Sequence, residues 1–570
     1  MCEALDRAES VGVLGMSLLA SFEQHVAARP YKPFLVLYEG DRFKILSYLD
    51  LMEGARRWAT AYRAQGVPAR SVVVIVLKQS TDLYTSFLGA MLAGLLPSYL
   101  PFPTPKQDPK LYWQAHATLF ERIRPAVAVT YAENAAALDG IAAPVGCPVI
   151  VADAQGVPRT DDGVPNVLPK QDELALLQHS SGTTGLKKGV MLTYGQIERH
   201  LTAYGRSVQF GLDDIVASWL PLYHDMGLIT SFLMPLQFGA SVVAMDPFEW
   251  VGEPMSILKL IERHKANYSW QPNFALAHMA RTRPADFTVD LSSMKAFIST
   301  SEPCKPETFA HFMATFAPNG LRPEQVITSY GMAENVFAST QGEYGVPARP
   351  LYVDREILRT RRRAVPVAHT GAGAEGFMSC GKPIDGLEIK IAPAPEDAER
   401  DDLDGVAVGE VCIRATFLFD GYYKNVDATM GAFDKDGWYH SGDIGFLLDG
   451  EIFICGRKKE MLVIHGRNFY ANDIEHAINQ VPGVKPGRCV AFALYDGETG
   501  SEEAVVIVES EIADTIGVRD LKRLVKKAVY DVLELSLRKV EVMPPGWLVK
   551  STAGKTSRSE NIKKFVGSRS

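Results

Sequence analysis

The sequence predicts an α/β fold, with a large N-terminal domain of α/β subdomains and a β subdomain, followed by a small α+β C-terminal domain. Three observations lead to this prediction. Short apolar runs rich in Val and Ile alternate with longer helical patterns over the first 330 residues or so. Gly-rich turns and shorter strands begin at about Gly371, and a new segment starts after Arg457. At roughly 100–200 residues per domain, a chain of 570 residues has room for about three such units.

The strands of the large domain are expected where short apolar runs do not alternate with charged residues, a pattern typical of strands covered on both faces. These runs are Val72–Leu77, Ala126–Val129, Val149–Ala152, Ser241–Met245, Ala296–Ile298 and Val326–Thr328. Helical patterns lie between them, at Ser47–Ala64 and Met255–His264 among others. Alternation of this kind predicts βαβ units and a mostly parallel sheet.

The later part of the chain has a different pattern. Shorter strands such as Glu388–Ile391 and Glu410–Arg414 stand between Gly-rich turns and predict the β subdomain. Two amphipathic patterns, near Asn472–Gln480 and Val518–Leu535, predict helices of the C-terminal domain.

Composition and charge exclude several classes of protein. The chain has 59 Lys and Arg against 67 Asp and Glu, a net charge of −8, so no broad basic field is available for nucleic acid. Acidic residues occupy the first positions, where a signal peptide needs positive charge. The longest apolar stretch, Phe87–Phe102, is broken by Pro97 and Pro101 and is too short for a bilayer. We therefore expect a cytoplasmic protein with no nucleic-acid partner and no transmembrane segment.

The seven cysteines are an odd number, lie far apart and form no C-x-x-C pair. This spacing favours reduced, mostly buried thiols over disulfides or metal ligands.

A candidate phosphate loop follows the apolar run Leu174–Leu177. Residues 179–190 read His-Ser-Ser-Gly-Thr-Thr-Gly-Leu-Lys-Lys-Gly-Val. Small hydroxyl residues and glycines let backbone N–H groups surround phosphate oxygens, and Lys187 or Lys188 adds positive charge. The spacing differs from a Walker loop because Lys187 stands where, counting from Gly182, a glycine is required. The alternative is a flexible Gly/Ser/Thr loop without a ligand.

Four further strings follow along the chain. They are Thr-Ser-Tyr-Gly-Met-Ala-Glu at 328–334, Tyr-His-Ser-Gly-Asp at 439–443, Gly-Arg-Lys-Lys-Glu at 456–460 and Lys-Ser-Thr-Ala-Gly-Lys at 550–555. Together with the phosphate loop they resemble, in order and over nearly the whole chain, the motifs of the adenylate-forming (AMP-binding) superfamily. That superfamily includes acyl-CoA synthetases, nonribosomal adenylation domains and luciferases. The resemblance implies ATP and Mg²⁺ as cofactors, with AMP as the bound moiety of the intermediate.

The resemblance also implies which residues hold the nucleotide. Phosphate binding falls to Ser180, Ser181, Gly182, Thr183, Thr184, Gly185 and Lys187. Tyr330 would supply a flat face for adenine, beside Ser329, Gly331 and Met332, although a core aromatic is the alternative for Tyr330. The turn Ser301-Glu302-Pro303 would lie below the adenine, with Ser301 a departure from the usual glycine or alanine. Asp443 offers two acceptors to the ribose hydroxyls, and Arg457 is expected near the same sugar.

Catalysis is expected to depend on charge, because adenylation joins two anions, a carboxylate and the α-phosphate of ATP. Lys555 is best suited to lie beside both, and the alternative is a surface lysine in a mobile tail. Glu334, after a turn that follows a strand, suits Mg²⁺, which keeps most of its waters. His224, in the string Trp-Leu-Pro-Leu-Tyr-His-Asp-Met-Gly-Leu at 219–228, would gate an acyl tunnel. The alternative for His224 is a histidine that caps a helix.

The resemblance implies a division into domains as well. Residues 1–457 form the large domain, with the β subdomain from about 371, and residues 462–570 form the small one. The hinge is expected at 458–461, where the small domain rotates around Lys459 between adenylation and acyl transfer. Without the resemblance, Lys458 and Lys459 would be an ordinary solvated pair.

Three features are closer to the fatty acyl-AMP ligases than to general acyl-CoA synthetases. They are the end of the 219–228 string, the string Gly-Arg-Asn-Phe-Tyr-Ala-Asn-Asp-Ile-Glu at 466–475, and an insertion at about 349–376. The insertion carries Arg359, Arg361, Arg362 and Arg363. We expect it to restrain the small domain or to block coenzyme A, while its arginines are also candidates for an acidic carrier-protein surface.

This branch implies that a medium- or long-chain fatty acid is adenylated and passed to the phosphopantetheine arm of an acyl carrier protein. The pair Thr183-Thr184 is nearer the CoA-ligase form, so a fatty acyl-CoA synthetase that uses free coenzyme A is the alternative. A non-catalytic nucleotide or acyl-chain binder and a luciferase-like oxygenase are the remaining alternatives. The intact Lys555, Glu334, Asp443 and Arg457 argue against the non-catalytic binder.

Overall fold

The fold is seen in a computed structural model that describes residues 17–104, 109–152, 168–180, 188–368, 373–393, 404–464, 467–496, 501–511, 517–550 and 556–567. Its largest sheet has nine strands in the order β18-β14-β13-β12-β11-β9-β10-β1-β2. The six from β13 to β1 are mutually parallel, and β14, β18 and β2 are antiparallel at the two edges. This arrangement confirms the predicted α/β class.

The bounds of the nine strands, along the chain, are β1 Pro33–Glu39, β2 Arg42–Ser47, β9 Ile215–Ser218, β10 Ser241–Ala244, β11 Tyr268–Pro272, β12 Ala296–Thr300, β13 Val326–Gly331, β14 Ala338–Gln341 and β18 Lys382–Pro383. Every residue of β9 to β12 except Ile215 is buried. Strands covered on both faces explain the continuous apolar runs of the sequence.

A second, four-stranded parallel sheet has the order β4-β3-β5-β6. Its strands are β3 Val72–Val76, β4 Leu96–Tyr99, β5 Val127–Thr130 and β6 Val149–Val151. Helix α4 (Thr81–Leu92) joins β3 to β4 and packs closely on α3 (Tyr48–Ala64), because Gly89 has room for no side chain: an added Cβ would lie 2.4 Å from Cβ of Trp58. Helix α3 begins at a capping box, in which Ser47 Oγ accepts from Asp50 N and Asp50 Oδ2 accepts from Ser47 N.

Other helices cover the two sheets. They are α2 Leu18–Ala28, α5 Pro109–Ile123, α6 Ala135–Ala142, α7 Tyr194–Ser207, α8 Asp225–Leu228, α9 Met234–Phe238, α10 Pro247–Gly252, α11 Ser256–His264, α12 Asn273–Thr282 and α13 Pro306–Phe316. The short hairpin β7 (Leu174–Ser180) and β8 (Lys188–Thr193) precedes α7. None of the helices in the described ranges combines the length and hydrophobicity that crossing a bilayer requires.

The antiparallel part that the Gly-rich sequence predicted is a four-stranded sheet, β19-β21-β22-β23. Its strands are β19 Leu387–Ala392, β21 Gly409–Ala415, β22 Tyr439–Leu448 and β23 Glu451–Arg457, and the helix α15 (Val426–Met430) precedes β22. The insertion packs against this sheet. Its strand β15 (Pro350–Asp354) pairs with β17 (Ala374–Met378), helix α14 (Arg355–Arg361) follows β15, and the two-residue strands β16 (Arg363–Ala364) and β20 (Val406–Ala407) pair with each other.

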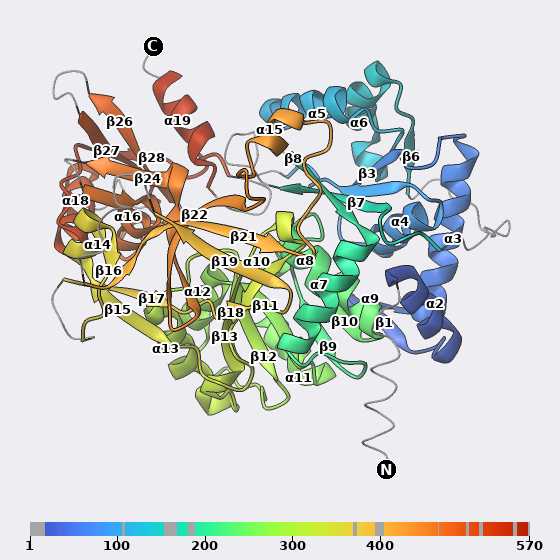
Figure 1. The fold of residues 1–570 in the computed structure, drawn as a ribbon, viewed down its shortest axis with the longest axis horizontal. Helices are drawn as coiled ribbons and strands as arrows, with labels where there is room; N and C mark the ends of the chain where they lie inside the picture. Colours follow the sequence, from blue (N-terminus) through green and yellow to red (C-terminus); the bar gives the residue numbers. More distant parts are fainter. Residues whose placement is uncertain are drawn as a thin grey trace.

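The C-terminal elements have a hydrophobic core of their own, from Leu462 to Val540. They are β24 Met461–Ile464, β25 Arg467–Tyr470, α16 Ala471–Ile478, β26 Cys489–Asp496, β27 Ser501–Glu509, α18 Val518–Leu533, β28 Lys539–Met543 and α19 Arg558–Gly567. In Figure 1 they lie at the end of the molecule opposite to α2 and α3. A separate core agrees with a small α+β unit, while the division at 457 and a hinge at 458–461 remain predictions.

The cysteines agree with the sequence-based prediction. The six that lie in described residues are free and buried.

Buried charges join the insertion, the large sheet region and the C-terminal elements. Lys305, just before α13, lies 2.8 Å from Oδ1 of Asp473 in α16 and 4.0 Å from Oε1 of Glu375 in β17. Glu375 Oε2 also pairs with Arg355 at 3.2 Å and with Arg359 at 3.1 Å, both from α14. Burial opposes a charge on Lys305, but the carboxylates of Asp473 and Glu375 outweigh it and raise the pKa of Lys305.

Replacing Asp473 with Asn is expected to loosen this junction. Lys305 would keep only the more distant Glu375, and removing one partner of a buried ion pair costs up to about 3–5 kcal/mol. Hydrogen exchange of the α16 amides should accelerate. The control is Asp531→Asn, which removes an exposed ion pair with Lys527 and should change stability by less than about 0.5 kcal/mol. Equal protection of α16 in Asp473→Asn and wild type would show that the buried pair does not hold the junction.

Candidate active site

A chain of polar contacts connects the large parallel sheet to the β22–β23 hairpin. The Tyr330 hydroxyl, at the end of β13, donates to Asp443 Oδ2 at 2.7 Å. Arg457 Nε lies 3.1 Å from Asp443 Oδ1, and the two residues are direct partners across the hairpin. Tyr330 and Asp443 are both buried. Three residues that the sequence assigned to adenine and ribose are therefore in contact, although they lie far apart in the chain.

The turn after β13 brings Glu334 beside this group. An added Cβ on Gly331 would lie 2.0 Å from the Phe337 carbonyl oxygen, so no other residue fits there without moving the backbone. Met332 N donates to that same oxygen at 2.7 Å. Val336 has φ 63° and ψ −58°, which a branched residue rarely adopts. The turn is thus closed tightly around the residue that carries the candidate metal ligand.

Glu334 is a buried carboxylate among charged and phenolic groups. Its Oε1 accepts from the Tyr422 hydroxyl at 2.8 Å. Burial raises the pKa of Glu334; the Tyr422 hydrogen bond and the Arg457 charge act against the rise, and the Asp225 charge adds to it. These electrostatic effects place Arg457 and Asp225 within range of the same carboxylate.

The ends of the candidate phosphate loop are paired in the β7–β8 hairpin, where Ser180 and Lys188 are register partners. Of the predicted phosphate-binding residues, Ser181, Gly182, Thr183, Thr184, Gly185 and Lys187 lie outside the described residues. Lys188 is described, with Nζ 4.4 Å from the ring centre of Tyr422. Burial lowers the pKa of Lys188, Glu334 opposes this, and Lys459 adds to it. Lys188 is therefore within electrostatic range of both Glu334 and the candidate hinge residue Lys459.

His224 precedes α8, and its Nδ1 lies 2.6 Å from Oδ1 of the neighbouring Asp225. The turn is narrow at Gly227, where an added Cβ would lie 2.3 Å from the Pro221 carbonyl oxygen. Both His224 and Asp225 side chains are partly exposed, at 20% and 14%. Asp225 contributes to the raised pKa of Glu334, so the turn lies within electrostatic range of the candidate metal ligand.

The remaining predicted nucleotide residues have distinct local roles. Ser301 lies after β12 with φ 68°, and Glu302 Oε2 accepts from Phe274 N at the start of α12. Ser329 is buried, and its hydroxyl donates to the Thr340 carbonyl in β14. Because side chains alternate along a strand, Ser329 and Tyr330 point to opposite faces of β13. Met332 is buried in the turn, and Pro303 follows Glu302 directly before the buried Cys304.

Ion pairs flank the candidate hinge residue Lys459 on both sides. Lys458 Nζ lies 3.0 Å from Glu410 Oε2 in β21, whose Oε1 also accepts from Gly442 N. Glu460 Oε2 lies 2.8 Å from Arg558, which pairs with Glu475 of α16 at 2.6 Å. Lys459 itself is exposed. The residue before it is thus tied to the β21–β22 sheet and the residue after it to the C-terminal elements.

Lys555 lies outside the described residues. The chain on either side of it is described, and Lys550 and Thr556 form an antiparallel bridge.

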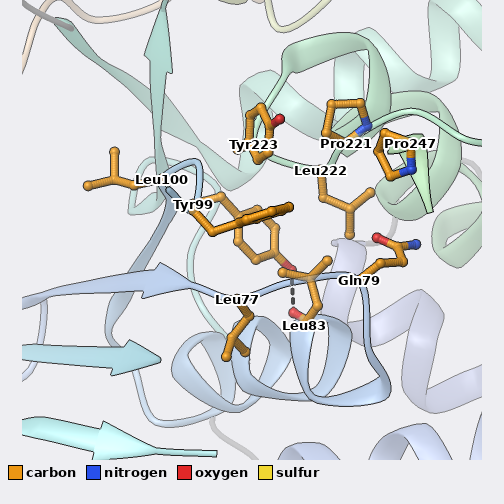
Figure 2. Close-up of a pocket in the computed structure, with 10 residues that line it drawn as sticks. Leu77, Gln79, Leu83, Tyr99, Leu100, Pro221, Leu222, Tyr223 and Pro247 are labelled. Atoms are coloured by element: carbon orange, nitrogen blue, oxygen red, sulfur yellow. Dashed lines mark hydrogen bonds between the residues drawn. The ribbon is translucent and has the colours of Figure 1, made fainter. Parts of the chain in front are cut away.

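A small apolar pocket adjoins the His224 turn (Figure 2). Leu222 and Tyr223 line it from the side of the turn, and Leu77, Leu83 and Leu100 line it from the β3–α4–β4 region. Its cavity volume of about 10 Å³ is far below the roughly 300–1,000 Å³ of typical ligand pockets. As it stands, this pocket does not identify an acyl tunnel.

Sequence reasoning missed Tyr422 and Glu410 at the site, and it gave Asp225 no role of its own. Tyr422 and Glu334 are separated by 88 residues, so no local spacing connects them. The doublet Tyr422-Tyr423 after Gly421 is an aromatic signal, but it does not distinguish a site residue from a core residue. Asp225 stands next to the predicted His224, and its acid was visible in the same string.

Fold and site together define an α/β protein with a cluster of carboxylate, phenol and guanidinium groups where the parallel sheet meets the β22–β23 hairpin. Residues 22–423 match the family described as AMP-binding enzyme. The chain therefore belongs to the AMP-binding enzyme family, whose members use ATP.

The chain is similar along most of its length to several known proteins. It is 31% identical over 525 residues to Rv1013 of Mycobacterium tuberculosis, covering 90% of this chain and 93% of that protein. It is 27% identical over 559 residues to the medium-chain-fatty-acid–[acyl-carrier-protein] ligase JamA of Moorena producens, covering 94% and 92%. The structure of a fatty acyl-adenylate ligase from L. pneumophila, in complex with acyl adenylate and pyrophosphate, aligns with TM-score 0.74 and 25% identity, covering 97% of each chain.

Proposed function

We propose that the protein activates a medium- or long-chain fatty acid with ATP to an acyl-adenylate, releases pyrophosphate, and passes the acyl group to the phosphopantetheine thiol of an acyl carrier protein. The contact of Tyr330, Asp443 and Arg457 beside Glu334 supports this most directly, because it gathers the groups an adenylate needs. The likeness to JamA over 94% of this chain supports a fatty acid and a carrier protein. A fatty acyl-CoA synthetase with the same first half-reaction is the alternative.

The nucleotide would be held by residues whose orientation is already fixed. One oxygen of Asp443 accepts a hydrogen bond from the Tyr330 hydroxyl, and the other pairs with Arg457. An ionised carboxylate has about four acceptor sites, so lone pairs remain for the ribose hydroxyls. The same hydrogen bond fixes the position of the Tyr330 hydroxyl, and the ring offers a flat face for stacking with adenine.

The residues around Glu334 fit Mg²⁺. The cation prefers oxygen ligands, keeps several waters and binds through one or two carboxylates plus substrate phosphates. Glu334 supplies a carboxylate, and Tyr422 connects it to Lys188, which borders the candidate phosphate loop. When bound there, Mg²⁺ would neutralise phosphate charge. Glu334 would be the ligand from this chain.

Lys555 would provide the positive charge beside the reacting carboxylate and α-phosphate. The position of its neighbours supports this role. Arg558, three residues further on, binds Glu460 next to the candidate hinge, so this part of the chain begins close to the β23 end of the site.

The contacts of the insertion favour the hypothesis that it restrains the small domain over the hypothesis that its arginines form a surface for a carrier protein. Arg359 is buried, donates to the Leu533 carbonyl of α18 at 3.0 Å and lies 5.0 Å above the ring of Phe469. Its own carbonyl accepts from Asn468 at 3.0 Å. An arginine engaged in this way is not available to a carrier protein, whereas Arg361 is exposed.

The proposed function is tested by pyrophosphate–ATP exchange over a panel of fatty acids, followed by transfer to free coenzyme A or to a phosphopantetheinylated carrier protein. Exchange that depends on a medium- or long-chain acid, with transfer to the carrier protein, is expected. Transfer to coenzyme A at an equal or higher rate would favour the alternative, and absence of exchange with every acid would refute adenylation of fatty acids.

Lys555→Ala is expected to keep ATP binding and to slow exchange by about 10²–10³, the usual effect of losing one charged stabiliser of a transition state. Calorimetric titration of ATP measures the first effect, and pyrophosphate exchange measures the second. Lys550→Ala, five residues earlier, is the control and should exchange normally. Unchanged exchange in Lys555→Ala would remove Lys555 from the catalytic residues.

Lys459→Pro is expected to spare adenylation and to block thioester formation. Proline fixes φ, and the ion pairs of Lys458 and Glu460 leave residue 459 as the point where the backbone must turn. Lys459→Ala keeps backbone freedom and serves as the control for loss of the side chain. If the proline variant loses both half-reactions together, Lys459 is not the pivot.

Arg359→Met is expected to raise acyl-CoA formation while acyl-adenylate formation survives, because it removes contacts that hold α14 on α18 and β25. The matched variant Arg361→Met should leave acyl-CoA formation unchanged. Product analysis of acyl-AMP and acyl-CoA measures both. If Arg361→Met instead slows carrier transfer most at low salt, the exposed arginine steers the carrier protein. Equal acyl-CoA in Arg359→Met and wild type would refute the restraint.

A further inference from the structure

Residues 419–423 connect the strand after the candidate phosphate loop with the turn that carries Glu334. Phe419 N donates to the Glu334 carbonyl at 2.9 Å. Met191 N donates to the Gly421 carbonyl at 3.0 Å, and Tyr423 N donates to the Gly189 carbonyl at 2.7 Å. Val190 and Tyr422 form an antiparallel bridge. One short segment is therefore bonded through its backbone to both parts of the site.

The side chain of Tyr422 also links these two parts of the site, because it contacts both Glu334 and Lys188. Its hydroxyl donates to Glu334 Oε1 at 2.8 Å, and both residues are buried. The Nζ of Lys188 lies 4.4 Å from the centre of its ring, within the range of a cation–π contact. One aromatic residue thus touches the carboxylate with its hydroxyl and the lysine with its ring.

We propose that Tyr422 is a positioning residue that sets the orientation of Glu334 toward the metal and supports Lys188 on the phosphate side. A carboxylate rotates about its last bond, and a hydrogen bond to one oxygen restricts that rotation. The inference deepens the proposed function and rests on it, because it takes Glu334 as the ligand of Mg²⁺. A buried tyrosine usually finds a hydrogen-bond partner, but the partners of Tyr422 are the candidate metal ligand and the lysine that borders the candidate phosphate loop.

The test measures Mn²⁺ binding, as a substitute for Mg²⁺, by electron paramagnetic resonance in the presence of α,β-methylene-ATP, which cannot be adenylated. Tyr422→Phe keeps the ring and loses the hydroxyl, and it should weaken Mn²⁺ binding about tenfold, since hydrogen bonds to charged groups are among the stronger ones. Binding of the analogue without metal should not change. Tyr422→Leu also loses the ring and should weaken the analogue itself.

Two controls separate positioning from a general loss of structure. Tyr423→Phe changes the neighbouring tyrosine and should bind Mn²⁺ within about twofold of wild type. In a Glu334→Gln background, which should itself weaken Mn²⁺ binding, Tyr422→Phe should add nothing, because the residue acts through Glu334.

The proposal is overturned if Tyr422→Phe binds Mn²⁺ like wild type, if it weakens Mn²⁺ equally in the Glu334→Gln background, or if Glu334→Gln binds Mn²⁺ like wild type. The proposed function is judged separately, by acid-dependent pyrophosphate exchange of the wild-type protein. A wild type that exchanges, together with any of these three results, would refute the role of Tyr422 and leave the proposed function standing.

Discussion

The hydrogen bond from Tyr330 to Asp443 is the contact on which the geometry of the site depends. It joins the end of β13 in the parallel sheet to the β22–β23 hairpin. Arg457, on the strand opposite Asp443, pairs with the other oxygen of the same carboxylate. Asp443 and Arg457 are register partners, so a slip of one residue in this hairpin would place the two side chains on opposite faces of the sheet. Arg457 is also the last residue of β23, directly before the candidate hinge. The candidate ribose residue Asp443 and the start of the candidate hinge are therefore set by one strand register.

Buried charges, beside apolar contacts such as that of Tyr470 with the cluster containing Leu358 and Phe377, mark the junction between the insertion, the large sheet region and the C-terminal elements. Lys305, Asp473 and Glu375 are buried there, yet ion pairs of this kind often add little net stability over an apolar core. When such a junction opens, its charges regain water, whereas apolar surface would be exposed at a cost. A charged junction can therefore hold one arrangement and still permit another, which is the physical requirement of a small domain that rotates. The ion pairs on either side of Lys459 fit the same requirement, because they leave one residue between two anchored segments.

The fold was predictable where burial controls the sequence. Runs such as Val72–Leu77 and Val326–Thr328 became β3 and β13 because strands covered on both faces have to be apolar. Strand β2 was not predicted, since its first four residues are exposed and carry no pattern of burial. The motif residues Tyr330, Glu334 and Asp443 could be named from the family resemblance, but their contacts could not. Tyr422 and Arg359 reach partners 88 and 174 residues away, and only the tertiary fold brings them there.

The turn around Glu334 shows why those distant partners matter. Val336 has a backbone conformation that costs free energy in a branched residue, and Phe337 N donates to the Asn335 carbonyl at 2.7 Å across it. Such a conformation persists only where its surroundings over-determine it. Here Gly331 allows the backbones to touch, Asn335 bonds to the Ala338 carbonyl, and Phe419 bonds to the Glu334 carbonyl. These contacts fix the backbone of the turn but not the rotation of the Glu334 carboxylate about its own side-chain bonds, and the Tyr422 hydroxyl acts on that rotation.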